Sequence, residues 1–580
     1  MDATAPRRRE PWLGIGIKLA AVAALLLATN AGLVQRLELL LDQGRMTTLL
    51  FFLAVWGLCA GALVVAAFQP NRWVRFGWAG ALALATAVGL TFRWMSQTDF
   101  GVMEAVSLWE MRQEASRATA FYGANAGVAA LVAVATLVVI AAPPTLRHPL
   151  ARRWLTRLAF VPALPVAAIA AIMFMKDGGG SQALPVQFTP LSVAVVSTAS
   201  LASNPVPARR EVAWAPGERL SRNVVMLVDE SIRGDYVDFT PGNTLTPRLA
   251  EHRDRIVDFG LATSGSTCSL YSNVMFRFAA ARRDLGGPLR ANPTIWQYAK
   301  AAGYRTVFID AQAAFVKDPG KLHSFMTLQE FGDIDGFYNM QNDVPAPELD
   351  FRLLEVIAEE LKSDRPVFIY AIKNGVHFPY DMVYPAAGAP FEPTMTTSPE
   401  DSTAARVNSY RNALRHNVDG FFARLFSDID LADTSIIYTS DHGQVFDPAR
   451  FTHCSTKDPD PREGIVPLFA ITGDPALDGR FTQAAADIRD RGSHFLVVPT
   501  LLELMGYRAG DVRAAFGGSM FAPGEPETAF TYGDVMGLVS PAVNWQPVDL
   551  SVPRLEAEAL TPEHPATAGQ AAPAAAAMTQ

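Results

Sequence analysis

Hydrophobic positions divide the chain into two parts with different patterns. Before about residue 180, apolar residues form long runs with few charges, and five of these runs are close to the roughly 20 residues that a helix needs to cross a bilayer. The five predicted spans are 12–34, 48–69, 73–93, 121–143 and 155–175. This pattern predicts a transmembrane domain of five helices over residues 1–177.

Arginines near the ends of these runs predict how the chain is oriented. They gather before the first run, between the second and third, and between the fourth and fifth: Arg7, Arg8, Arg9, Arg72, Arg75, Arg147, Arg152, Arg153 and Arg157. Because cytoplasmic loops carry an excess of Lys and Arg, the N-terminus is predicted to be cytoplasmic, and five crossings put the rest of the chain outside. The alternative, a cleaved signal peptide, lacks a small-residue cleavage site after the first run.

Residues 221–530 have the alternating pattern of a soluble α/β domain. Predicted strands cover 223–229, 305–310, 366–373, 435–440 and 465–471, and predicted helices cover 294–303, 351–363, 404–428 and 494–506. This alternation favours a mainly parallel sheet with helices on both faces, which binds its ligands at the C-terminal ends of the strands. Residues 178–220 begin with GGGSQ and read as a linker. Residues 531–580 form a tail whose low-complexity end is predicted to be disordered.

Polar residues with ligand chemistry follow several of these predicted strands. Asp441 and His442 come directly after the strand at 435–440, Glu230 follows the first strand, and His377 follows the third. His453 lies eleven residues beyond His442. Carboxylates and imidazoles are good ligands for zinc or a related ion. The alternatives are a solvated strand end, a glutamate at a helix start, and loop histidines bonded to backbone.

A candidate nucleophile lies in GSTCSLYSN, residues 265–273, which precedes the helical run VMFRFAAAR. Hydroxyl groups there lie near a helix N-terminus, where backbone N–H groups and the helix dipole favour a phosphoryl group. A metal on such a hydroxyl would lower its pKa and activate it. The spacing leaves four residues open: Ser266, Thr267, Cys268 and Ser269. The alternative is an ordinary helix cap, as for His494 at the start of a later helix.

The net charge argues against one class of partner. The net charge of −8 disfavours a nucleic-acid-binding protein, because phosphate backbones require an excess of Lys and Arg. It does not exclude an anionic substrate, since a bound metal supplies local positive charge.

Five of these motifs, in this order, resemble the phosphoethanolamine transferases in the sulfatase-like branch of the alkaline phosphatase superfamily. The motifs are NVVMLVDESIRGD, GSTCSLYSN, NGVHFPY, SDHGQ and THC. The loop QTDFGVMEA between the third and fourth spans also resembles a periplasmic loop of that family. The resemblance implies an α/β domain of the alkaline-phosphatase/sulfatase type on a bacterial inner-membrane anchor, with this domain in the periplasm. It further implies one or two Zn²⁺ ions, phosphatidylethanolamine as donor, and lipid A or another envelope glycan as acceptor.

The resemblance also assigns roles to residues of this chain. The metal ligands would be Glu230, Thr267, Asp441 and His442. Thr267 would be the nucleophile, because its spacing to Ser272 matches the family's threonine and a following serine. His377 and His453 would bind the transferred phosphoryl group or a second metal ion.

Cysteine usage departs from the family and leaves alternatives open. The chain has three cysteines, and the stretch FIDAQAAFVKDPGK has none where the family has several. Cys59 lies in an apolar run, so a single disulfide beside the site, between Cys268 and Cys454, is the pairing that remains open. Cys268 is a rival nucleophile of the sulfatase type, but the proline and arginine of that motif are missing. Alternative functions are a glycerophosphate transferase, a sulfatase-like hydrolase acting on periplasmic glycans, and a catalytically silent receptor.

Overall fold

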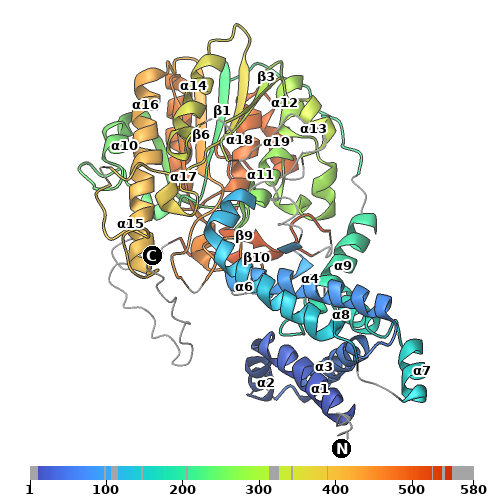
Figure 1. The fold of residues 1–580 in the computed structure, drawn as a ribbon. Coiled ribbons are helices and arrows are strands. Elements are labelled where there is room, and N and C mark those ends of the chain that lie inside the picture. Colours follow the sequence, from blue (N-terminus) through green and yellow to red (C-terminus); the bar gives the residue numbers. More distant parts are fainter. Residues whose placement is uncertain are drawn as a thin grey trace, which may run out of the picture.

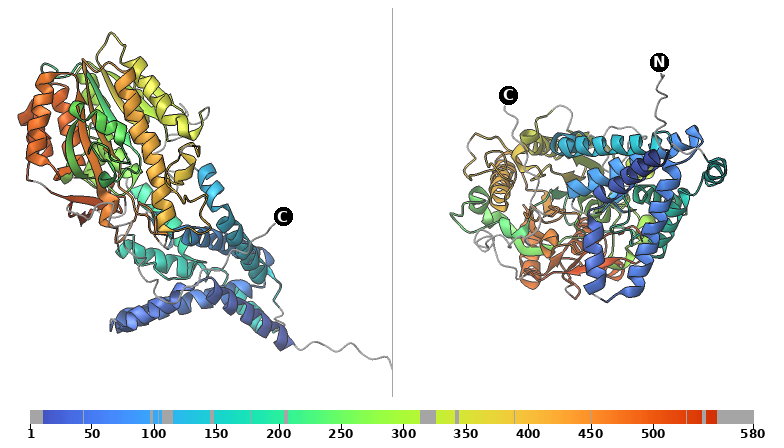
Figure 2. Two further views of the ribbon diagram at one scale, coloured as in Figure 1. Left: turned by 90° about the vertical axis from the view of Figure 1, so that its left-hand side faces the viewer. Right: turned by 60° about the horizontal axis from the view of Figure 1, so that its bottom comes forward.

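The computed structural model describes residues 11–550 except 43, 97–98, 103, 106–114, 145–147, 177, 204–206, 313–325, 341–343, 388, 449, 526 and 539–541. An α/β domain stands at one end of a region of apolar helices, and the left view of Figure 2 shows the same separation. Residues 551–580, the end of the predicted tail, and parts of QTDFGVMEA and FIDAQAAFVKDPGK lie outside the described residues (Figure 1).

Apolar helices form the N-terminal region. They are α1 (Pro11–Ala28), α2 (Gly32–Asp42), α3 (Met46–Ala67), α4 (Arg72–Ser96), α6 (Ala115–Ala141), α7 (Pro149–Arg157) and α8 (Ala163–Met175). Among the described residues, α3 and α4 are long and apolar enough to cross a membrane, and α1 with α2, bent by 68°, would make a third span. The predicted count of five is not confirmed. The last predicted span shows why, because the 13 residues of α8 extend roughly 20 Å, against a hydrocarbon core of about 30 Å.

The predicted linker contains a helix. After α8 the chain forms α9 (Thr189–Ser203), which lies beside α4 and α8 (Figure 1). Within the helical region, Asn30 and Gln187 join the first helix pair to the start of this segment by a hydrogen bond of 3.2 Å between their side chains. The stretch 207–216 then runs to the α/β domain, where the Arg210 N–H donates to the Ala291 carbonyl.

The α/β domain is built on an eight-stranded sheet in the order β4-β3-β5-β1-β6-β7-β2-β8. The strands are β1 (Asn223–Asp229), β2 (Val257–Thr263), β3 (Arg305–Asp310), β4 (Gly336–Asn339), β5 (Val367–Ile372), β6 (Thr434–Ser440), β7 (Ile465–Thr472) and β8 (Gly492–Ser493). All five predicted strands are confirmed, and β2, β4 and β8 were missed. The sheet is mainly parallel, as predicted, but β7 runs antiparallel to both β6 and β2.

Helices cover both faces of this sheet. Successive residues of β1 point to opposite faces, so Val224 and Met226 pack in one core while Val225 and Leu227 pack in the other. The first core includes α12 (Ile295–Ala301), α17 (Pro475–Ile488), α18 (Val497–Leu504) and α19 (Ala509–Phe516). The second includes α10 (Pro247–Glu251), α14 (Leu349–Glu360), α15 (Thr403–Leu414) and α16 (Phe421–Asp428).

Further elements of the α/β domain lie outside the eight-stranded sheet. α11 (Ser269–Arg277) begins within the predicted nucleophile segment, and α13 (Leu328–Gly332) follows β3. A two-stranded antiparallel sheet of β9 (Ala529–Tyr532) and β10 (Asn544–Pro547) lies on the side of the domain that faces the apolar helices (Figure 1). A π-helical turn at Arg415–Gly420 joins α15 to α16, and such turns are frequent at functional sites.

Candidate active site

The ends of β1 and β6 bring the predicted metal ligands to one edge of the sheet. These strands are parallel neighbours, with Asp229 in register with Ser440. Each strand is followed at once by a candidate ligand, so Glu230 and Asp441 lie at the same edge, and the Asp441 N–H donates to the Asp229 carbonyl at 2.9 Å. Ligand chemistry therefore sits where a parallel sheet places it.

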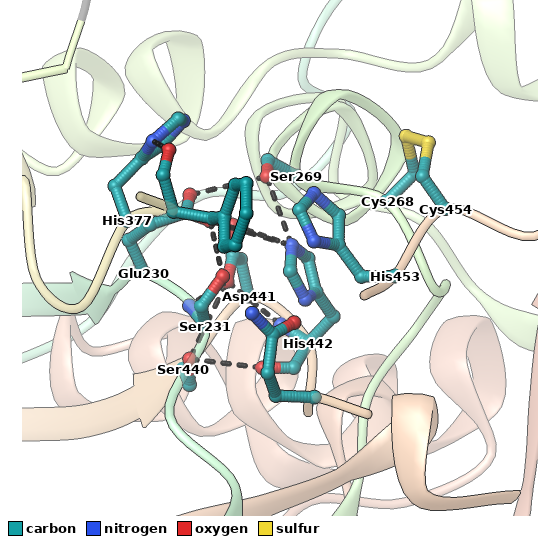
Figure 3. A network of polar contacts seen from close by, with 12 residues as sticks. Glu230, Ser231, Cys268, Ser269, His377, Ser440, Asp441, His442, His453 and Cys454 are labelled. Carbon is teal, nitrogen blue, oxygen red and sulfur yellow. Dashed lines mark hydrogen bonds and ion pairs between the residues drawn. A yellow bond between two sulfur atoms is a disulfide. The ribbon is translucent and has the colours of Figure 1, made fainter. Parts of the chain in front are cut away.

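Glu230, Asp441 and His442 form a tight, fully buried cluster (Figure 3). His442 Nε2 lies 3.5 Å from Glu230 Oε1 and 3.6 Å from Asp441 Oδ2. His442 Nδ1 lies 2.7 Å from the Gly443 carbonyl. Because a carbonyl only accepts, Nδ1 carries the proton and the lone pair of Nε2 is directed into the cluster.

This donor set fits a divalent cation. Asp441 Oδ1 accepts from two backbone N–H groups, at 3.0 Å from Ser231 and 2.8 Å from His442. Asp441 Oδ2 is also buried, yet among the described residues it accepts no hydrogen bond. Two carboxylates this close in a buried place need compensating positive charge. A zinc ion bound by carboxylate oxygen and imidazole nitrogen supplies it.

His453 joins this cluster from a different part of the chain. One ligand atom from each of Glu230, His442 and His453 lies within 4.8 Å of the others, and the two imidazole rings stack at 4.1 Å. Desolvation lowers the pKa of His453 well below its ordinary value, with His442 and His377 adding to the effect. His453 is therefore a neutral imidazole at neutral pH, the form that ligates metals. The resemblance had assigned His453 to the transferred phosphoryl group or to a second metal ion.

His377 lies across the cluster from His453 in the view of Figure 3. Its Nδ1 is 2.6 Å from the Phe378 carbonyl, the backbone bond expected of a loop histidine. The turn before it requires Gly375, whose φ is +53° and whose added Cβ would meet Asp229 Oδ1 at 2.3 Å. His377 stands outside the group of three candidate ligands.

The Ser269 hydroxyl lies beside the cluster. Ser269 is the first residue of α11, and its Oγ lies 3.1 Å from Glu230 Oε2 and 3.0 Å from His442 Nε2. Thr267 contacts the site region through its backbone, where its carbonyl accepts from the Cys454 N–H at 2.7 Å. The geometry therefore favours Ser269 over the residue that the family spacing selected, because the start of α11 sets which hydroxyl faces the ligands.

The pairing of Cys268 with Cys454, which the sequence left open, is present as a disulfide. It takes the Cys268 sulfur out of the list of candidate nucleophiles. Cys59, the third cysteine, is a buried free thiol in α3.

Two supporting residues were missed from the sequence. Gln312 donates from Nε2 to Glu230 Oε2 and to the Lys373 carbonyl, both at 2.8 Å. It follows β3, so the rule that strand ends carry site residues could have found it. His494, interpreted as a possible cap, accepts the Gly265 N–H at its Nδ1 at 2.9 Å and lies 3.1 Å from the Thr439 hydroxyl. Burial lowers the pKa of His494 to about 3, so it holds the nucleophile segment as a neutral ring.

The buried Lys373 ammonium supports the cluster through Asp229, the residue before Glu230. Lys373, directly after β5, donates to the Asp229 carboxylate and to the Asn417 carbonyl in the π-helical turn, and lies 3.5 Å from Asp350. Burial raises the pKa of Asp229 and the pKa of Asp350, the latter to about 6, while Lys373 lowers both. Asp229 Oδ1 accepts the Glu230 N–H at 2.9 Å, so this network fixes the backbone of a candidate ligand.

The loop that carries His453 also touches the apolar-helix region. Thr456 donates to Glu104 at 2.6 Å, and the rings of Phe92 and Phe451 are 6.2 Å apart. The cluster therefore lies on the side of the α/β domain that faces the apolar helices.

Comparisons with known proteins agree with this architecture. Residues 222–507 match the family model "Sulfatase". The integral membrane protein lipooligosaccharide phosphoethanolamine transferase A (EptA) from Neisseria meningitidis is similar in structure, with a TM-score of 0.61 and 17% identity over 86% of this chain and 95% of that chain. The periplasmic domain of EcEptC from Escherichia coli, in complex with Zn, matches with a TM-score of 0.45 and 21% identity over 57% of this chain and 94% of that chain. No curated protein matches the sequence. Because the match to EptA covers 86% of this chain, the shared fold extends beyond residues 222–507 to the apolar helices.

Proposed function

We propose that this chain, whose residues 222–507 form a sulfatase-family domain, is a metal-dependent phosphoethanolamine transferase. It would be anchored in a bacterial inner membrane with its catalytic domain in the periplasm. The observation that carries the proposal is the convergence of the Ser269 hydroxyl with Glu230, Asp441 and His442 at the ends of adjacent strands. The similar structure of a phosphoethanolamine transferase supports phosphoethanolamine as the group that is transferred.

Glu230, Asp441, His442 and Ser269 would hold one zinc ion, and His453 would complete that site or contribute to a second one. Bound zinc acts as a Lewis acid, lowering the pKa of the serine hydroxyl and offsetting charge on the phosphoryl oxygens. Ser269 replaces Thr267 in the proposed role of nucleophile. Its place at the N-terminus of α11 also directs backbone N–H groups toward an incoming phosphate.

The reaction would proceed by two displacements at phosphorus. In the first, Ser269 Oγ bonds to the phosphorus of phosphatidylethanolamine and the bond to the diacylglycerol oxygen breaks. The serine loses one proton and the departing oxygen takes up one. In the second, a hydroxyl or phosphate of lipid A or another envelope glycan attacks, the bond to Oγ breaks, and Ser269 regains a proton. His377 and His453 would line the place of the equatorial oxygens, where charge collects.

The disulfide bears on both compartment and chemistry. Disulfides persist in oxidising compartments such as the periplasm, which agrees with a domain outside the cytoplasm. Because Cys268 is bonded to Cys454, a sulfatase mechanism that begins from a free cysteine has no nucleophile at this position. A serine-based hydrolase or glycerophosphate transferase keeps the same geometry and becomes an outcome of the test.

The test compares wild type, Ser269→Ala and Thr267→Ala in cells and as purified proteins. Mass spectrometry of lipid A and total glycolipid is expected to show a gain of one phosphoethanolamine with wild type and with Thr267→Ala, and none with Ser269→Ala. Peptide mapping of wild type incubated with phosphatidylethanolamine alone should find phosphoethanolamine on Ser269.

Three results would change the proposal. Transfer by Ser269→Ala with loss in Thr267→Ala would return the nucleophile to Thr267. A different added group, such as glycerophosphate, would keep the mechanism and replace the donor. Release of free phosphoethanolamine, with no modified glycan, would identify a hydrolase.

A further inference from the structure

The disulfide joins the two segments that meet at the candidate site. Cys268 directly precedes Ser269, and Cys454 directly follows His453 (Figure 3). The two cysteines are 186 residues apart in sequence. One covalent bond therefore lies within one residue of the proposed nucleophile on one side and within one residue of a candidate ligand on the other.

The candidate ligands are held in place in different ways. Glu230 and His442 follow strands whose ladders hydrogen-bond on both sides, and Ser269 begins a packed helix. His453 lies in the segment 442–460, whose described residues form neither helix nor strand. Its ring has a hydrogen-bonding contact of 3.0 Å with its neighbour, the Thr452 hydroxyl. Of the candidate ligands, His453 therefore depends most on what fixes its backbone.

The backbone at Cys454 requires such support. Its φ is +64°, in the left-handed region that a residue with a Cβ rarely adopts. A conformation of this kind is strained and persists where the surrounding structure determines it. Here the Cys454 N–H donates to the Thr267 carbonyl at 2.7 Å, and the Ser455 N–H donates to Glu463 at 3.0 Å. The disulfide adds a covalent bond, for which water does not compete as it does for these hydrogen bonds.

The other end of the disulfide is rigid. Cys268 is buried and caps α11, and it packs in a small core with Tyr271, Met275 and Phe495. The bond therefore ties a loop to a packed helix. We infer that the Cys268–Cys454 disulfide is a positioning element for the metal site, which holds the His453 imidazole against His442 before the ion arrives. This inference rests on the proposed function, because it concerns the same ligands.

The expected effect follows from when the loop becomes ordered. With the disulfide in place, His453 is ordered on folding, and an ion binds a preassembled set. Without it, the loop no longer holds His453 at the site and the ion loses this ligand, so affinity falls. Loss of a group that supports a metal ligand typically costs 10–100-fold in affinity. The Cys268→Ala/Cys454→Ala variant is expected to bind Zn²⁺ about 10–100-fold more weakly than wild type.

The experiment uses the full chain in detergent, stripped of metal and titrated with Co²⁺, whose visible spectrum reports the ligands. Wild type should give a spectrum that includes the His453 imidazole, and the double variant should lose that contribution and match His453→Ala. Competition with Zn²⁺ then gives both affinities. The control is Cys59→Ala, which keeps the disulfide and should match wild type. A disulfide that only stabilised the fold would lower the melting temperature and leave the Co²⁺ spectrum of the folded protein unchanged.

A second arm covers a double variant that fails to fold. Wild type is reduced with a phosphine, freed of the reductant, titrated under argon, and then reoxidised and titrated again. Reduced protein is expected to behave like the double variant, and reoxidation should restore the wild-type affinity. Equal affinity and equal spectra in oxidised and reduced protein would overturn the inference and leave the proposed function standing. Absence of Co²⁺ and Zn²⁺ binding by oxidised wild type would overturn the proposed function itself.

Discussion

The buried Lys373 ammonium leads to a prediction about stability. Lys373→Met keeps the length of the stem and removes the charge. Lys373 and Asp229 are both fully buried, and Asp350 is 1% exposed, so the variant leaves two buried carboxylates without their counter-charge. Breaking a buried pair by removing one partner costs about 3–5 kcal/mol. The free energy of unfolding of the α/β domain is expected to fall by about this amount.

A second substitution separates charge from packing. Asp229→Asn keeps Oδ1 as the acceptor for the Glu230 N–H and replaces Oδ2, which accepts from the Tyr438 hydroxyl, by an amide NH2 that can donate to the Tyr438 oxygen. The substitution also removes one of the two unpaired charges. The double variant Lys373→Met/Asp229→Asn is therefore expected to be more stable than Lys373→Met alone. Residues in direct contact show coupling energies of about 0.5–3 kcal/mol, and a buried ion pair should lie at the upper end.

The loss in Lys373→Met should also depend on pH. Burial already raises the pKa of Asp229 and Asp350 while Lys373 lowers it, so removing Lys373 raises both further. A carboxyl whose pKa is higher in the folded state than in the unfolded state contributes most stability at low pH, and the contribution is lost as pH rises through the folded pKa. The deficit of the variant is therefore smaller at pH 5 than at pH 8.

The assay is urea unfolding of the purified full chain in detergent, followed by tryptophan fluorescence, since Trp296 is buried in the domain core. The matched control is Lys362→Met, because Lys362 is 72% exposed and pairs with an exposed Glu359. It should change stability by less than about 1 kcal/mol. The reasoning is refuted if Lys373→Met loses no more than Lys362→Met, or if the double variant loses the sum of the two single losses.

Three further outcomes are expected around the site. Gln312→Leu removes the hydrogen bond to Glu230 Oε2 and should weaken Zn²⁺ binding about 10–100-fold in a chelator competition, with unchanged affinity contradicting the support assigned to it. Gly443→Ala puts a Cβ 2.2 Å from the Arg462 carbonyl and should cost about 1–3 kcal/mol in urea unfolding, whereas Gly479→Ala, with open space in α17, should gain about 0.5–1 kcal/mol. Zn²⁺ at 100 times its Kd should stabilise metal-stripped wild type by about 2.7 kcal/mol and leave Asp441→Ala unchanged, and equal stabilisation of both would place the ion elsewhere.

The sequence by itself determined the main frame of the α/β domain. Runs such as 223–229 and 435–440 have consecutive apolar residues between polar ends, and in the structure every residue of β1 and β6 is buried. A strand of this kind lies inside a sheet covered on both faces, so its end marks the place for ligands. That reasoning located Glu230, Asp441 and His442 at one edge, and the small number of cysteines left a single pairing open.

Tertiary structure decided what depends on direction and on distant partners. Ser269 and Thr267 are two residues apart, and the start of α11, capped by Cys268 and packed on a core from the C-terminal part of the chain, sets which hydroxyl faces Glu230. The antiparallel direction of β7 likewise follows from the path of residues 441–464, because a strand pattern has the same period in either direction. The partners of Lys373 could not be predicted from the sequence, because Asp229 lies 144 residues away along the chain. The hydrophobic pattern fixes which residues are buried, whereas packing between distant segments fixes which polar atoms meet.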